Sequence, residues 1–210
     1  ASYDVKAQRP ADGNIFVPIS TLYYLESNQG GVIGNANLQP RVTTAYELGF
    51  KQTLSRNSAL SIIATYQEVR GDYTLVRVDN AYPIAYNSYQ NLDFSTTKSL
   101  RAEYELRGEG RTSLRMNYAL QYADGTGPNA NSSAALIQAG QPNLRSLYPL
   151  TFDVRHKITA LVDYRFKAGN DYTGPVWFDK RIFENSGANL IVSTQSGQPY
   201  TRYLQPAANA

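Results

Sequence analysis

The chain has no cysteine, and only one histidine, one methionine and one tryptophan among its 210 residues. Without thiols it forms neither a disulfide nor a thiolate metal site, and a single histidine cannot build a histidine-rich site. Its longest apolar runs are four residues long, at Leu22–Leu25 and Ala134–Ile137, whereas a transmembrane helix needs about 20. These absences exclude disulfide scaffolds, cysteine- or histidine-based metal centres and helical membrane spans.

Charged residues are also scarce. They make up 18% of the chain, against roughly 25% in an average globular protein. The net charge is +3, and no block of lysine and arginine stands out, so the sequence does not indicate a nucleic-acid partner. Tyrosine is abundant instead, at 17 residues, and this aromatic content favours a folded chain over a disordered one.

The strongest pattern is alternation of apolar and polar residues with a period of two. In Ser99–Leu106 the residues Leu100, Ala102, Tyr104 and Leu106 share one face. After the turn signal at 108–110 the same alternation resumes and continues to Tyr122. A period of two is typical of a strand with unlike faces, so these segments predict a long antiparallel hairpin.

The same alternation recurs along the chain. It is clear at 45–51, 60–67 and 157–166 and shorter at 3–7 and 188–195. Together these segments predict about seven strands, longer than the usual strand of about five or six residues. No segment shows convincing helical periodicity, so the predicted fold class is all-β.

The connections between these strands are of two kinds. Short turns near 55–58 and 108–111 alternate with long polar segments at 8–41, 71–93 and 123–151. Long loops at one end and short turns at the other are typical of outer-membrane β-barrels. The segment 167–187 breaks this rule. We interpret it as a folded insertion at the turn end, whose aromatic cluster at Trp177–Phe183 packs against the rim.

The two faces of the strands predict their surroundings. In a membrane barrel the apolar face meets lipid and the polar face lines the lumen. Tyrosines near the ends of the apolar rows, such as Tyr46, Tyr66, Tyr122 and Tyr164, are typical of an aromatic girdle. The alternative is a large extracellular β-sandwich with solvated charged faces. The predicted lumen-lining residues are Arg101, Glu103, Glu105, Arg115, Asn117, Lys157, Asp163 and Arg165.

Five segments of the chain read as motifs in a fixed order. The first reads Asn-Ala-Asn-Leu-Gln-Pro and continues through Thr-Thr-Ala-Tyr-Glu-Leu-Gly-Phe-Lys. The five segments are Asn35–Lys51, Leu60–Arg70, Thr97–Glu103, Tyr148–His156 and Ser196–Thr201. In this order they resemble motifs of the TonB-dependent receptors of the outer membrane, with a likeness to the long-looped receptors of Bacteroidetes.

The resemblance implies an antiparallel transmembrane β-barrel in the cell outer membrane. The family imports a ligand with energy from the inner membrane, delivered by TonB through a plug domain. These 210 residues contain neither a plug domain nor a TonB box, and the family's barrel has 22 strands. We therefore expect residues 1–210 to be seven or eight strands of a single barrel domain, with lipid and the remainder of the barrel as partners. The alternative is a structural barrel subunit, or an interaction partner of a lipoprotein or another outer-membrane protein.

No catalytic constellation stands out, so we predict neither an enzyme nor a cofactor or metal. His156 and the pair Glu103 and Glu105 are the nearest candidates, and both fit a hydrogen-bonding or lumen-lining role. Tyrosine offers a broad amphipathic contact at low entropic cost, and the predicted loops are rich in it. The candidate ligand-binding residues are Tyr82, Tyr86, Asn87, Tyr89 and Asn91.

Overall fold

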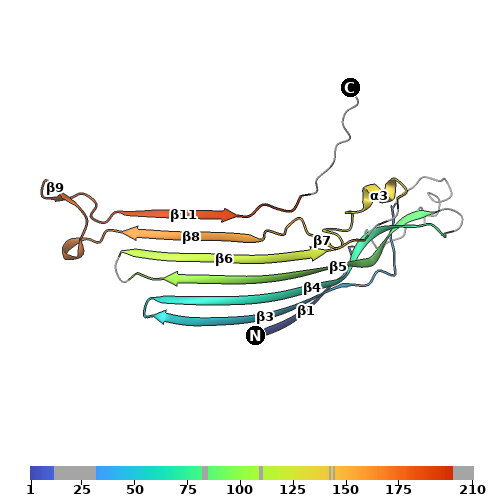
Figure 1. Cartoon of the computed structure of the whole chain (residues 1–210), viewed down its shortest axis with the longest axis horizontal. Coiled ribbons are helices and arrows are strands. Elements are labelled where there is room, and N and C mark those ends of the chain that lie inside the picture. Colours follow the sequence, from blue (N-terminus) through green and yellow to red (C-terminus); the bar gives the residue numbers. More distant parts are fainter. Residues whose placement is uncertain (12–31, 82–84, 109–110, 142, 144, 201–210) are drawn as a thin grey trace, which may run out of the picture.

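The computed structural model describes residues 1–11, 32–81, 85–108, 111–141, 143 and 145–200, and one antiparallel sheet dominates it (Figure 1). The main strands are β1 (Ser2–Gln8), β3 (Arg41–Ser55), β4 (Ser58–Val78), β5 (Tyr86–Leu106), β6 (Thr112–Gly125), β8 (His156–Arg165) and β11 (Gly187–Gln195). The short elements are β2 (Val32–Ile33), α3 (Ala134–Gln138), β7 (Tyr148–Pro149), the 3₁₀ turn η1 (Gly169–Asp171), β9 (Val176–Trp177) and β10 (Lys180–Arg181).

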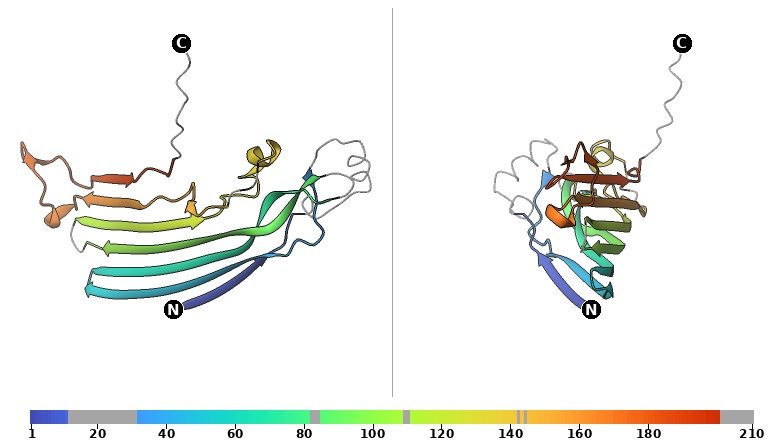
Figure 2. Two further views of the ribbon diagram at one scale, coloured as in Figure 1. Left: turned by 45° about the vertical axis from the view of Figure 1, so that its right-hand side comes forward. Right: turned by 90° about the vertical axis from the view of Figure 1, so that its left-hand side faces the viewer.

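The strands lie in the sheet in chain order: β1-β3-β4-β5-β6-β8-β11. Two short strands join its sides, β2 parallel to β5 and β7 antiparallel to β6. The main strands form a single layer in both views of Figure 2, and within the described part no second sheet packs on either face. This arrangement differs from the two packed sheets of the β-sandwich alternative.

The hydrogen-bonded register explains the alternation in the sequence. Directly opposed residues of neighbouring strands lie on the same face of a sheet, and Leu100 lies opposite Ala64 on one side and Leu120 on the other. Likewise Leu114 lies opposite Leu106 and Val162, and Val162 opposite Leu190. Most apolar residues of these strands therefore meet on one face, which we call the apolar face. The opposite one is the charged face.

The two ends of the sheet differ as predicted. The β3–β4 turn and the β5–β6 connection lie at one end, which we call the turn end, while the β4–β5 connection and α3 lie at the other, the loop end (Figure 1). Antiparallel neighbours require this alternation of connections. The predicted placement of the long segments opposite the short turns is confirmed for the described residues.

The prediction of a long loop at 71–93 is wrong. β4 continues to Val78 and β5 begins at Tyr86, so most of this segment is a hairpin that extends beyond its neighbours. The register shifts between Arg70 and Tyr73, where Gly71 adopts φ of +67°. Such a positive φ suits glycine at a β-bulge. The bulge interrupts the alternation, and for this reason the sequence reading ended the strand too early.

The buried side chains gather at the loop end. Leu75 and Ile137 are 2% exposed and Leu150 is 1% exposed, with Val76, Ala123 and Leu38 also buried. We call this cluster and the polar groups around it the cap. Along the rest of the sheet both faces are largely accessible, and Leu48 is 67% exposed. Among the described residues no helix is long and apolar enough to cross a membrane.

Candidate functional site

The charged face brings together all eight residues that the sequence assigned to a lumen. Arg101 shares a cross-strand row with Lys157 through Ala119, and Glu103 lies opposite Asn117. Glu105 lies opposite Arg115, and Asp163 and Arg165 follow on the same side of β8. The common face of these residues is a consequence of the register. Its identity as the wall of a lumen remains a prediction.

Two acidic residues organise the polar contacts of this face. Glu105 Oε1 lies 3.2 Å from Arg115 Nη2 and 3.1 Å from Arg107 Nε. Asp163 accepts hydrogen bonds from both neighbouring strands, from Asn189 Nδ2 at 2.6 Å and from Ser113 Oγ at 3.5 Å. These contacts tie adjacent strands together across the charged face.

The remaining five side chains of the set make no hydrogen bond or ion pair with the part of the chain that the structure describes. They are Arg101, Glu103, Asn117, Lys157 and Arg165. The charged face therefore offers cations, a carboxylate and an amide that are available to water or to a ligand. Apolar residues that interrupt this polar surface include Ile63, Val69, Leu161 and Ile191.

A row of tyrosines crosses the apolar face toward the loop end. The rings of Tyr3 and Tyr46 are 5.1 Å apart, and those of Tyr46 and Tyr66 are 6.2 Å apart. Further along the row, the Arg155 guanidinium lies 4.5 Å from the centre of the Tyr122 ring. Of the tyrosines read from the sequence, Tyr46, Tyr66 and Tyr122 lie in this row, where Lys98 of β5 separates Tyr66 from Tyr122. Tyr164 lies toward the turn end, opposite Thr112.

The cap holds two buried carboxylates, which the sequence reading missed. Asp153, with no exposed surface, accepts from the Ala123 backbone N–H at 3.0 Å and from Arg155 Nε at 2.9 Å. Asp93, 4% exposed, accepts from Thr126 Oγ1 at 2.8 Å. Each carboxylate has a hydrogen-bond partner about 30 residues away in sequence, so local pattern gave no signal. The bond to Asp153 also raises the pKa of Arg155.

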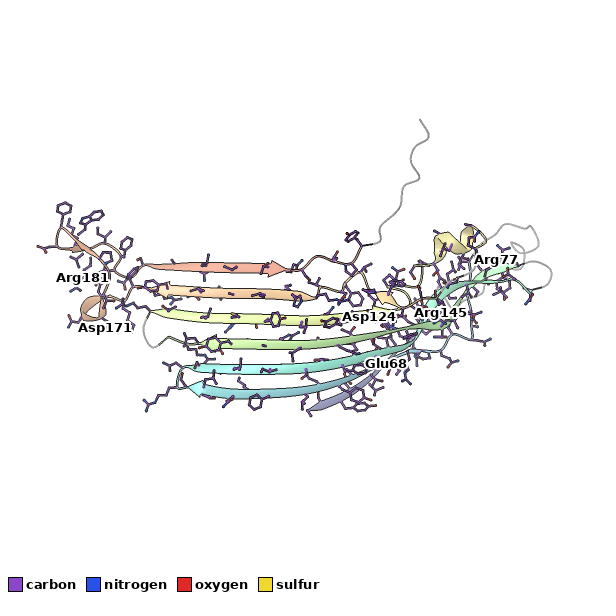
Figure 3. All side chains as sticks on the ribbon, viewed as in Figure 1. Glu68, Arg77, Asp124, Arg145, Asp171 and Arg181 are labelled. Carbon is purple, nitrogen blue, oxygen red and sulfur yellow. The ribbon has the colours of Figure 1, made fainter. Side chains whose placement is uncertain are left out.

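A third contact extends this network. Arg145 Nε lies 3.5 Å from Asp93 Oδ1, so this contact ties the loop after α3 to β5. Figure 3 shows Arg145 at the loop end of the sheet. Burial, followed by the charge of Asp93, raises the pKa of the Tyr148 hydroxyl. The cap is consequently an internally bonded unit rather than a set of independent loops.

The candidate ligand-binding residues lie on the extended hairpin. Asn91 uses its side chain within the protein, because Nδ2 donates to Gly71 O and Gln39 O and Oδ1 accepts from Gln39 N–H. Tyr89 donates its hydroxyl to Asn131 Oδ1 at 3.1 Å. Tyr86 and Asn87 lie on opposite faces near the hairpin tip, and Tyr82 lies outside the described residues. The geometry thus gives Asn91 a bracing role at the bulge.

A pocket of about 450 Å³ opens at the loop end of this hairpin. Its lining includes Val76, Gln90, Ile137, Asn143 and Arg145. Thr74, which lies opposite Gln90, is fully buried, and its Oγ1 has no hydrogen-bond partner among the described residues. None of the four described candidates, Tyr86, Asn87, Tyr89 and Asn91, is among the residues that line this pocket.

The segment 167–187 folds at the turn end, as predicted, but only part of its aromatic cluster packs. Phe166 stacks on Phe183 with ring centres 5.5 Å apart, and Tyr172 lies 6.1 Å from Phe166. In contrast Trp177 is 70% exposed and Phe178 92% exposed. They lie on the β9–β10 hairpin, whose short strands project away from the sheet (Figure 1). The expected packing of Trp177 against the rim is therefore wrong.

Among the catalytic candidates, His156 and Glu105 have side-chain partners within the described chain, and Glu103 does not. His156 Nδ1 lies 2.9 Å from the Tyr118 hydroxyl, and the two rings stack. Glu105 is ion-paired, as described above, and Glu103 lies opposite an asparagine. In the part of the chain that the structure describes, no group of three or more histidine, aspartate or glutamate side chains is placed to hold a metal ion.

These features define a class of fold: a segment of the wall of an antiparallel transmembrane β-barrel, with an apolar and a charged face. The structure is similar to the outer membrane transporter YddB from Escherichia coli, with a TM-score of 0.50 and 12% sequence identity. The match covers 79% of this chain and 26% of that one, so the chain spans about a quarter of the transporter's length. No model of a known protein family matches the sequence, and no curated protein matches it.

Proposed function

We propose that this chain is part of the wall of an outer-membrane transport barrel of the TonB-dependent receptor type. The observation that carries the proposal is the continuity of the two faces. An apolar face extends over seven neighbouring strands while arginine, lysine, aspartate and glutamate share the opposite one. In a barrel the first face meets lipid and the second lines the interior.

The edges of the sheet support a larger barrel. β1 and β11 each pair with one neighbour in the described structure, which leaves one row of backbone groups on each without a strand partner. Unpaired backbone groups in hydrocarbon each cost several kcal/mol. Residues 1–210 therefore pair with the remainder of the same barrel domain. In this setting the loop end faces the exterior and the turn end faces the periplasm.

Transport follows from the kind of barrel. The five motifs resemble TonB-dependent receptors, and the similar solved structure is described as an outer membrane transporter. The charged face, with its available arginines and lysine, provides an interior that can contact a polar ligand or a plug domain. TonB acts through that plug domain, and the described candidate ligand residues Tyr86, Asn87 and Tyr89 lie on β5 toward the loop end, which faces the exterior in this arrangement.

Adjacent residues of β5 provide the test of orientation. The 210 residues have no cysteine, so Leu100→Cys and Arg101→Cys place a single spin label in this chain on opposite faces. In liposomes containing the intact protein, the label at 100 should be relaxed more by oxygen, which dissolves in lipid, and the label at 101 more by a water-soluble nickel chelate. Equal or reversed accessibilities contradict the proposal.

Uptake provides the test of transport. A strain without this protein and a strain without TonB are grown on a panel of iron chelates, oligosaccharides and peptides, each as the sole source of its nutrient. Both strains should lose growth on the same source, and the intact protein should restore it in the first strain. A strain that keeps growth on every source but loses another outer-membrane protein from its membrane would instead support the structural-subunit alternative.

A further inference from the structure

A shallow groove crosses the apolar face next to the tyrosine row. Its volume is about 590 Å³, and its apolar lining includes Leu48, Ala64 and Leu100. These three residues lie opposite one another in a single cross-strand row, Leu48 to Ala64 to Leu100. The groove is deepest at Ala64, because the small methyl group of Ala64 lies between the two larger leucine side chains. The groove is thus apolar and has room for an extended hydrocarbon chain.

One cation stands at the mouth of this groove. Lys98 lines it together with Tyr66 and Tyr122, which are its cross-strand neighbours. The lysine is exposed and makes no ion pair or hydrogen bond with any residue that the structure describes. A lysine on an apolar face is costly unless its ammonium reaches the polar boundary of the membrane. Its position in the tyrosine row places it at that boundary.

The cations near this row are already engaged. Arg70 Nε lies 2.7 Å from Glu68 Oε1, and Arg155 Nε lies 2.9 Å from Asp153 Oδ2. Figure 3 shows Glu68 and Asp124 near the loop end of the sheet. Lys98 is consequently the cation of this band that is available to an external anion.

We propose that this groove binds an anionic lipid, with one acyl chain over Ala64 and the charged headgroup on Lys98. The inference rests on the proposed lipid-facing orientation of the apolar face, and it adds a specific site to that face. The groove supplies hydrocarbon contact, Lys98 supplies charge, and the hydroxyls of Tyr66 and Tyr122 supply hydrogen-bond donors at the height of the headgroup.

Native mass spectrometry of the intact protein in neutral detergent tests this site. The protein is titrated with dioleoyl phosphatidylglycerol and, separately, with dioleoyl phosphatidylcholine, which has the same acyl chains and no net charge. We expect a saturable adduct with the anionic lipid. Lys98→Gln should weaken it about fivefold, in line with the contribution of one lysine at a lipid surface, and Lys98→Arg should retain it.

Two further variants distinguish the contribution of the Lys98 charge to lipid binding from that of the groove. Ala64→Leu fills the floor and should reduce binding of both lipids, with folding verified by the heat-dependent gel mobility of the barrel. Lys157→Gln removes a lysine from the charged face and should leave binding unchanged, as a matched control. Inorganic phosphate should not displace the lipid, because it lacks the acyl chain. Displacement by phosphate, or equal binding by the wild type, Lys98→Gln and Ala64→Leu, overturns the proposal.

The spin-label experiment on residues 100 and 101 keeps the two proposals distinct. If label 100 lies in lipid and Lys98→Gln has no effect, the lipid site is wrong and the barrel proposal stands. If label 100 lies in water, both are wrong.

Discussion

The cap and the rest of the sheet, which we call the wall, share strands but differ in how far they bury them. β4 and β5 run through both regions, and the Gly71 bulge separates them. In the wall, Tyr66 of β4 and Leu100 of β5 are 36% and 39% exposed; in the cap, Leu75 of β4 is 2% exposed and belongs to a buried cluster with Ile137. The cap therefore carries its own hydrophobic core, whereas the apolar residues of the wall depend on an apolar surrounding for their stability. A bulge thus allows one strand to lie in a protein core on one side of it and against an apolar surrounding on the other.

The largest expected effect is in the cap. Leu75→Ala removes a fully buried side chain, and core truncations of this type cost about 2–5 kcal/mol. Limited proteolysis should show faster cleavage around α3, while the heat-dependent gel mobility of the whole barrel stays unchanged. Loss of the wall together with the cap would show that the two regions are a single cooperative unit.

A charge on the apolar face is expected to have a similar but slightly smaller effect. Leu100→Arg near the middle of the membrane should lower the free energy of unfolding by about 2–4 kcal/mol, measured by urea titration in liposomes. Its control is Glu103→Gln on the opposite face, which should be tolerated. A tolerated arginine at position 100 would mean that this face does not meet hydrocarbon.

The buried carboxylate of the cap comes next. Asp153→Ala leaves the Ala123 N–H and the Arg155 guanidinium without their acceptor, at a cost of about 1–3 kcal/mol. Asp153→Asn keeps an acceptor for the backbone N–H and should cost less. Amide hydrogen exchange at Ala123 distinguishes the two variants. Equal protection in both would contradict the role of the carboxylate.

The bulge itself gives the smallest expected effect. Gly71→Ala imposes a methyl group at φ of +67°, although the nearest side-chain atom, Asn91 Nδ2, is 3.7 Å from the new carbon. The cost is therefore conformational, about 1–2 kcal/mol. Hydrogen exchange should rise in the hairpin beyond the bulge and stay constant at Leu100. A uniform rise of hydrogen exchange along both strands would show that the bulge is not the boundary between the two regions.

The wall was predictable because its signal is local. A period of two at Ser99–Leu106 and at Ile158–Phe166 places side chains on faces without any knowledge of partners, and the observed register agrees. The cap was not predictable in this way. Thr74, Leu75 and Val76 are all buried, so both sides of the strand are covered there and alternation disappears.

The site was predicted unevenly for the same reason. Alternation placed Arg101 and Glu103 on one face without reference to any distant residue. The role of Asn91 depends on Gln39 and Gly71, and that of Asp93 on Thr126 and Arg145. Side chains that look free for a ligand in the sequence are engaged by partners that only the folded chain brings close.

The bonds of Asp163 to strands on both sides have a consequence for assembly. A strand that slips by one residue turns every side chain to the other face. If β11 slipped in this way, Asn189 would leave Asp163 and an adjacent apolar residue, Leu190, would replace it on the charged face. The same holds for β6: a slip of this strand by one residue would move the Ser113 hydroxyl away from the Asp163 carboxylate. Both hydrogen bonds of Asp163 therefore form only in the observed register, which they favour over a register shifted by one residue.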